Sequence, residues 1–120
     1  MLPRPHRLPA SEIPHVMKYG GRVAGNGMIL IYRNRGQGTI NNKQETSRFA
    51  FIVSTKVDKR ATVRNRMRRL MSESVRHVYD SIRPGVDGVF AGSKSLIGLT
   101  QQEAETIVQN LLRKADLLKT

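Results

Sequence analysis

The chain has 120 residues with 21 Lys and Arg against 9 Asp and Glu, so its formal net charge is +12. This length allows one domain with a modest core, and the excess of positive charge favours an anionic partner, with nucleic acid preferred over an anionic membrane surface. The sequence holds no cysteine, which excludes disulfides, a thiol nucleophile and cysteine-based metal sites.

The first ten residues are predicted to form an extended arm of the single domain 1–120, because they hold three prolines and few apolar residues. They lack the apolar segment of a secretory signal. No apolar run in the chain approaches the ~20 residues that span a bilayer. We therefore expect a cytoplasmic protein without a membrane partner.

A short helix is predicted over residues 11–20. Ser11 is a suitable N-cap, Pro14 fits the first turn, and Gly20 marks the end. One face of this helix is apolar and carries Ile13, Val16 and Met17.

Three strands are predicted, over residues 28–33, 48–54 and 86–92, because these runs are short and rich in β-branched and aromatic residues. The first two are joined by a polar, Gly- and Asn-rich connection over residues 34–47. In the second strand both faces carry apolar side chains, so the pattern does not say which face meets the helices.

Two longer helices are predicted, because apolar residues recur at spacings of three and four in two segments. The first covers residues 62–82, with Met67 and Met71 in its stripe, and the second begins with a capping box formed by Thr100 and Glu103. Helices and strands in this order predict an α+β domain with two layers.

The first of these helices begins inside a strongly basic segment. Residues 56–76 hold eight Lys or Arg and two acidic residues, and no Asp or Glu falls between Lys59 and Ser72. A merely solvated helix face usually mixes charge signs, because like charges one turn apart repel. Arginine also suits bidentate contact with phosphate. The segment therefore favours nucleic-acid binding over the solvated-face alternative.

The order of residues in this segment carries a family resemblance. The stretch "STKVDKRATVRNRMRR" over residues 54–69 resembles the signature of the bacterial ribonuclease P protein component, with its Arg-Asn-Arg core at residues 64–66. Weaker similarity covers nearly the whole chain, including "DGVFAGS" at residues 87–93 and "LTQQE" at residues 99–103.

The resemblance implies an αβββαβα sandwich with a left-handed βαβ crossover, of the ribosomal-protein-S5-domain-2-like type. It also implies two partners: a catalytic RNA, which carries out catalysis with magnesium, and a precursor tRNA whose 5′ leader is removed. We expect a monomer in a 1:1 ribonucleoprotein, with no cofactor bound by the protein alone.

The resemblance also implies two sets of binding residues. The catalytic RNA is expected to contact the basic segment through Lys56, Lys59, Arg60, Arg64, Asn65, Arg66, Arg68 and Arg69. The leader is expected in a cleft between the first helix and the open face of the sheet, lined by Ile13, Met17, Lys18, Tyr32, Phe49 and Phe51. Ile13 and Met17 stand where the family often has aromatic residues.

No catalytic or metal-binding residues are expected in the chain itself. Glu73 and His77 lie one helical turn apart, but two ligands are too few for a metal site, and a salt bridge or hydrogen bond is the simpler interpretation. Two other functions stay open from the residues alone. One is a ribosomal or other structural RNA-binding protein. The other is a DNA-binding module, against which the sequence shows no dimer seam and no helix-turn-helix pattern.

Overall fold

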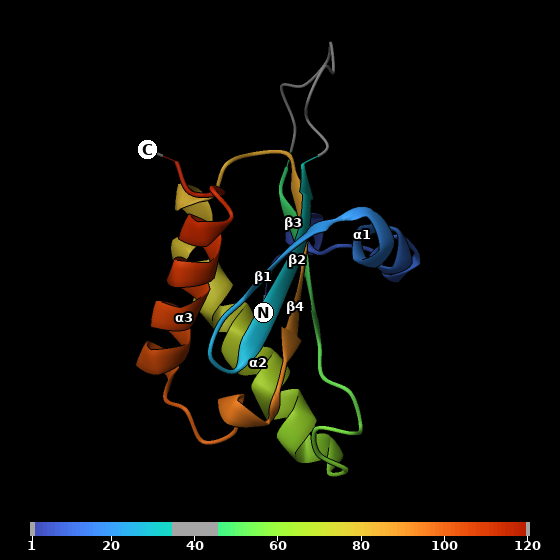
Figure 1. Cartoon of the computed structure of the whole chain (residues 1–120), viewed down its shortest axis with the longest axis vertical. Helices are drawn as coiled ribbons and strands as arrows, with labels where there is room; N and C mark the ends of the chain where they lie inside the picture. Colours follow the sequence, from blue (N-terminus) through green and yellow to red (C-terminus); the bar gives the residue numbers. More distant parts are fainter. Residues whose placement is uncertain (1, 35–45, 120) are drawn as a thin grey trace.

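The computed structural model describes residues 2–34 and 46–119 and contains a four-stranded sheet with helices on both faces (Figure 1). The strands are ordered β1-β2-β4-β3 across the sheet. In chain order the main elements are α1 (Ile13–Tyr19), β1 (Gly21–Ala24), β2 (Met28–Asn34), β3 (Arg48–Ile52), α2 (Ala61–Val78), β4 (Val86–Gly92) and α3 (Gln101–Lys114). The α+β class and the αβββαβα order are confirmed.

The sheet is mixed. β2 pairs antiparallel with both β1 and β4, whereas β3 pairs parallel with β4. The parallel pair is joined through α2, as the predicted βαβ crossover requires; its left-handedness and the likeness to the ribosomal protein S5 domain stay predictions. Residues 35–45 of the predicted polar connection lie outside the described residues.

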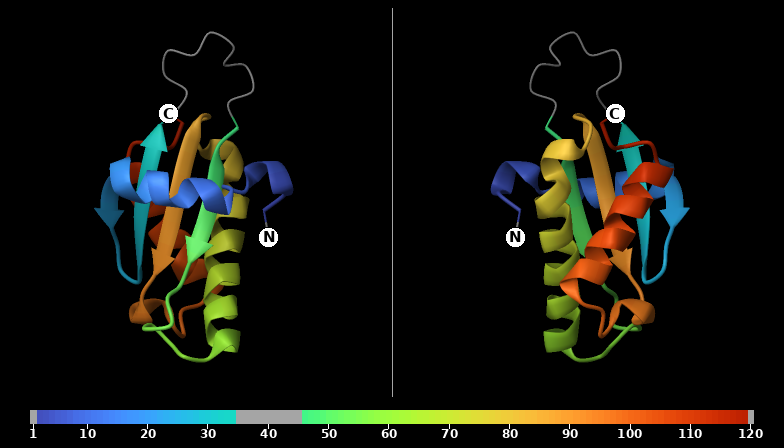
Figure 2. Two further views of the ribbon diagram at one scale, coloured as in Figure 1. Left: turned by 90° about the vertical axis from the view of Figure 1, so that its right-hand side faces the viewer. Right: turned by 90° about the vertical axis from the view of Figure 1, so that its left-hand side faces the viewer.

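The two faces of the sheet are covered differently. α2 and α3 lie side by side on one face, and α1 crosses the other face alone (Figure 2). Because successive side chains of a strand alternate between faces, Met28 and Leu30 of β2 join the core under α2 and α3, and Ile31 packs with α1. β4 is central and its residues 86–90 are all buried, as expected of a strand covered on both faces.

The helix predicted over residues 62–82 is shorter in the structure. α2 ends at Val78, a 3₁₀ turn covers Tyr79–Ser81, and Ile82 forms an isolated β-bridge with Leu118. The predicted apolar stripe is confirmed at the centre of the helix, where Met67 and Met71 are buried against the sheet.

The capping box of α3 is confirmed. The Thr100 Oγ1 accepts from the backbone N–H of Glu103 at 3.1 Å, and the Thr100 N–H donates to Glu103 Oε1 at 2.9 Å. These two bonds satisfy groups that the first helical turn leaves unpaired.

The N-terminal predictions need correction. Ser11 is not the cap of α1, because it lies in a 3₁₀ turn (Ala10–Glu12) and Glu12 precedes the helix instead. The predicted extended arm is interrupted by a 3₁₀ turn (Arg4–His6). Leu2 and Leu8 are buried, and the Leu8 N–H donates to the Phe49 carbonyl at 3.0 Å along the outer edge of β3. The arm therefore packs against the sheet at these positions.

An ion-pair network ties the start of α1 to the sheet. Arg48 on β3 donates to both carboxylate oxygens of Asp87 on β4, each at 3.0 Å, and to both of Glu12, at 2.8 and 3.1 Å. The Asp87 side chain is only 3% exposed and that of Glu12 is 45% exposed. Hydrogen bonding to Asp87 raises the pKa of Arg48 above its ordinary value, so the guanidinium stays charged.

We predict that Asp87→Asn lowers the free energy of unfolding by about 2–4 kcal/mol, because it removes one charge of a buried pair and leaves Arg48 partly uncompensated. Glu12→Gln is the matched control and should cost less than about 1 kcal/mol, since its carboxylate is half solvated. Urea denaturation measures both. Equal losses for the two variants would contradict the assigned burial.

Candidate nucleic-acid interface

The basic face of α2 is set by the side of the helix that packs on the sheet. Met67, Met71 and Val75 point into the core, and this leaves Asn65, Arg66 and Arg69 exposed to solvent. A helix held along an apolar seam has little freedom to rotate, so its outward cations form a fixed array.

The arginines at the start of α2 and in the loop before it, which we call the cationic array, differ in the hydrogen bonds and ion pairs that they make within the protein. Arg60 pairs with Asp58 at 2.9 Å, and hydrogen bonding from the Arg60 side chain lowers the pKa of Asp58 to about 2. Arg64 donates to the backbone carbonyls of Asp58 and Lys59 at 2.9 and 2.8 Å. These two arginines therefore help to build the loop before α2.

The remaining cations are available for a ligand. Arg68 donates to the Asn65 side chain, and within residues 2–34 and 46–119 no carboxylate pairs with Arg66, Arg68 or Arg69. The side chains of Lys56 and Lys59 are exposed in the preceding loop. The structure thus brings all eight residues predicted for catalytic-RNA binding to the start of α2 and its loop, with Arg64 and Arg60 in structural roles as well.

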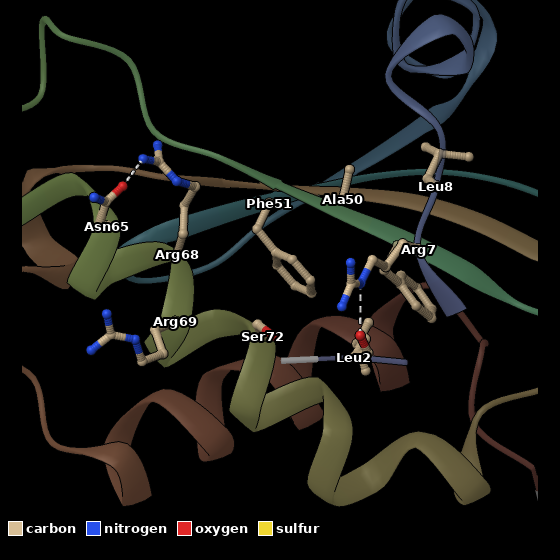
Figure 3. Close-up of a pocket in the computed structure, with 10 residues that line it drawn as sticks. Leu2, Arg7, Leu8, Ala50, Phe51, Asn65, Arg68, Arg69 and Ser72 are labelled. Carbon is tan, nitrogen blue, oxygen red and sulfur yellow. Dashed lines mark hydrogen bonds between the residues drawn. The ribbon is translucent and has the colours of Figure 1, made fainter. Parts of the chain in front are cut away.

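A pocket of about 480 Å³ opens beside this array, between α2, the edge strand β3 and the N-terminal arm (Figure 3). We call it the β3-edge pocket. Its polar wall is formed by Arg7, Asn65, Arg68, Arg69 and Ser72, and its apolar wall includes Phe51 and Leu2. None of the described residues that line it is acidic.

The aromatic residues predicted for the leader cleft lie on the face of the sheet opposite to α1. Phe49 is 1% exposed and belongs to the core cluster under α2 and α3, where a Cβ added at Gly88 would lie 2.8 Å from its ring. Phe51 and Tyr32 pack against the same cluster. None of the three shares the α1 face with Ile13 and Met17, so the predicted set does not form one cleft.

The α1 face carries a different set of side chains. The partly buried residues there are Ile13, Met17, Ile29, Ala50 and Ile52, packed around a small cluster that includes Val16 and Ile31. The predicted leader-binding set includes Ile13 and Met17 but not Ile29, Ala50 and Ile52. The alternation within residues 48–54 held the signal for Ala50 and Ile52, but not which face α1 covers.

Tyr19 is a further residue of α1 that the predicted leader-binding set does not include. It is 63% exposed at the end of α1, and the Lys18 ammonium lies 5.3 Å from the centre of its ring. On a helical wheel Tyr19 falls opposite the Ile13–Met17 stripe, and this was the signal for an exposed aromatic ring.

The predicted contact between Glu73 and His77 is replaced by two others. Glu73 pairs with Arg76 at 2.8 Å, and this hydrogen bond lowers the pKa of Glu73 to about 2, while His77 pairs with Glu105 on α3. In the part of the chain that the structure describes, no three His, Asp or Glu residues gather as a metal site would require.

Comparison with known proteins decides the family. The family model for ribonuclease P matches residues 2–116. The ribonuclease P protein component of Synechococcus sp. (strain JA-2-3B'a(2-13)) is 33% identical over 119 residues, covering 98% of this chain and 87% of that protein. The chain belongs to the ribonuclease P protein family.

Other members of the ribonuclease P protein family agree. The protein component of Clostridioides difficile (strain 630) is 34% identical over 89% of this chain and 88% of its own length. The Staphylococcus aureus RNase P protein superposes with a TM-score of 0.77 at 18% identity, covering 95% of this chain and 98% of that one. The Thermotoga maritima protein gives 0.75 at 23%, covering 90% and 96%. The last two support the fold.

Membership of the ribonuclease P family makes this chain the protein subunit of a ribonuclease and implies an RNA partner within a ribonucleoprotein. It favours neither the ribosomal nor the DNA-binding alternative. Among the described helices, none is long and apolar enough to cross a membrane.

We predict that Arg69→Ala lowers the slope of log affinity against log salt for a ribonuclease P RNA by about 0.7–0.9, the value of one phosphate contact. Thermal and urea unfolding should be unchanged, because the side chain is exposed and makes no hydrogen bond or ion pair within the described chain. Filter binding across a salt series measures the slope.

Arg64→Ala is the informative comparison. It should lower the free energy of unfolding by about 1 kcal/mol, because the loop before α2 loses its two carbonyl contacts. A wild-type slope in Arg69→Ala would contradict phosphate contact at that position.

Proposed function

We propose that this chain assists removal of the 5′ leader from precursor tRNA by binding the catalytic RNA of ribonuclease P with α2 and the leader with the α1 face. Family membership implies an RNA partner within a ribonucleoprotein. The assignment of the two surfaces rests on one observation, which is that they lie on opposite faces of the sheet. α2, which carries the cationic array, and α1 cover opposite faces of one sheet (Figure 2).

The charge of α2 supports the first part of the proposal. Exposed arginines without carboxylate partners neutralise phosphate repulsion when a large RNA folds against them. Their planar groups also suit contact with phosphate oxygens and unpaired bases. The α2 array is therefore assigned to the structured RNA.

The shape of the α1 face supports the second part. Single-stranded nucleic acid is held by flat apolar or aromatic contacts to bases and by cations along its phosphates. Met17, Ile52 and Ile29 offer apolar contact, and Lys18 and Arg22 are exposed near the end of α1. With Ile13 and Met17 in place of aromatic rings, van der Waals contact replaces stacking along this surface.

The chain itself is assigned no chemical step. We place the magnesium ions of the reaction on the RNA, because Mg²⁺ prefers oxygen ligands such as those of phosphate. The protein's contribution is to hold the leader and to reduce the repulsion between two polyanions.

Reconstitution tests the proposal. Added to a bacterial ribonuclease P RNA at low magnesium, the chain should stimulate cleavage of a precursor tRNA at the correct 5′ position, because it supplies cations that the RNA otherwise takes from solution. The double variant Arg66→Ala/Arg69→Ala should fold and fail to stimulate at the same protein concentration. If the wild-type chain gives no stimulation, the proposal falls, and a structural RNA-binding role takes its place.

The leader surface is tested by Met17→Glu. A carboxylate placed beside the leader phosphates should weaken binding of precursor tRNA to the holoenzyme about 5- to 10-fold, a loss of about 1–1.4 kcal/mol, and leave mature tRNA unaffected. Met17→Gln controls for side-chain shape and should lose less. Equal weakening for precursor and mature tRNA would move the leader away from α1.

A further inference from the structure

We propose that the β3-edge pocket holds one unpaired nucleotide of the catalytic RNA, with its base against Phe51 and its flanking phosphates beside Arg7 and Arg68. This inference rests on the proposed function, because it names a contact made by the RNA that α2 binds. It assigns Phe51 to the catalytic RNA instead of the leader.

Phe51 is prepared for such a contact. Its ring lies nearly parallel to that of Phe90, with centroids 5.8 Å apart and an angle of 15° between the planes. Phe90 is fully buried, whereas Phe51 is only half-buried and lines the pocket (Figure 3). The ring is therefore fixed from the core side and accessible from the pocket, as a base-stacking platform must be.

The charges around the pocket select an anionic strand. Arg7 comes from the N-terminal arm and Arg68 and Arg69 from α2, so cations stand on two sides of the Phe51 ring. The Arg7 Nε donates to the Leu2 carbonyl at 2.8 Å, which holds this side chain at the pocket and leaves its terminal nitrogens for phosphate. Because the described residues of the lining include no carboxylate, an anion there meets no repelling negative charge from them.

Asn65 adds a polar group at the α2 side of the pocket. Its Oδ1 accepts from Arg68, so its amide NH₂ remains as a donor. A donor beside a stacking ring can bond an acceptor on the edge of a base. A volume of about 480 Å³ is within the range of small-ligand sites, and it suits one extruded nucleotide rather than paired bases.

The position of the pocket decides between the two RNA partners. Four of its lining residues belong to α2, including Asn65, Arg68 and Arg69 of the predicted RNA-binding set. The leader surface lies across the sheet, beneath α1. An RNA seated on the α2 array therefore reaches the pocket directly.

Phe51→Leu tests the proposal, because leucine keeps apolar volume at the core side and removes the π-face. We expect the affinity of the chain for ribonuclease P RNA to fall roughly 5- to 150-fold, the loss of one stacked base, and Phe51→Tyr to retain it. Chemical probing of the RNA should show one unpaired nucleotide protected by the wild-type chain and exposed with Phe51→Leu. The ratio of precursor to mature tRNA affinity should not change.

Two results would overturn the inference: wild-type RNA affinity and protection in Phe51→Leu, or a loss confined to precursor over mature tRNA. Should Phe51→Leu unfold, Arg7→Gln decides in its place, since Arg7 is exposed. This variant should lower the slope of log RNA affinity against log salt by about 0.7–0.9 and should weaken the protection of the same nucleotide. Failure of the wild-type chain to stimulate cleavage is a separate outcome and refers to the proposed function alone.

Discussion

The apolar seam between α2 and the sheet is the constraint on which the rest of the protein depends. Met67, Met71 and Val75 are buried along it. Gly92 of β4 leaves space for the two methionines, since a Cβ there would lie 3.3 Å from both methionine methyl groups. Close packing of this kind fixes the rotation of the helix about its axis. Repulsion between like charges one helical turn apart costs only a few tenths of a kcal/mol, and this packing offsets it.

The seam also separates the two surfaces that we propose for binding. By filling one face of the sheet, α2 and α3 leave the opposite face to α1 alone, and a short helix covers only part of it (Figure 2). The Arg48 network fixes the start of α1 to β3 and β4. α1 is therefore held on this face by ion pairs as well as by apolar contact. One protein of this size can thus present a basic surface and an apolar surface on opposite sides of its sheet.

Sequence reasoning reached the elements whose signal is local. The stripe of α2, the capping box of α3 and the span of β4 each depend on residues close in the chain. β1 did not emerge from its residues, because four residues with Val23 as their one half-buried side chain give no periodicity; the family resemblance alone supplied it. The faces of Phe49 and Phe51 were not predictable either, since both faces of β3 are apolar and tertiary packing decides which meets α2. The carbonyl contacts of Arg64 depend on loop geometry that the basic pattern does not encode.

Directed cleavage measures the separation of the two surfaces most directly. The chain has no cysteine, so a single one introduced by Thr62→Cys at the start of α2, or by His15→Cys on α1, can carry a hydroxyl-radical source. Both positions are exposed. In the assembled holoenzyme with precursor tRNA, the probe at residue 62 should cut the catalytic RNA and the probe at residue 15 should cut the leader. Cleavage of the same RNA segment from both positions, or the reverse assignment, would contradict the account.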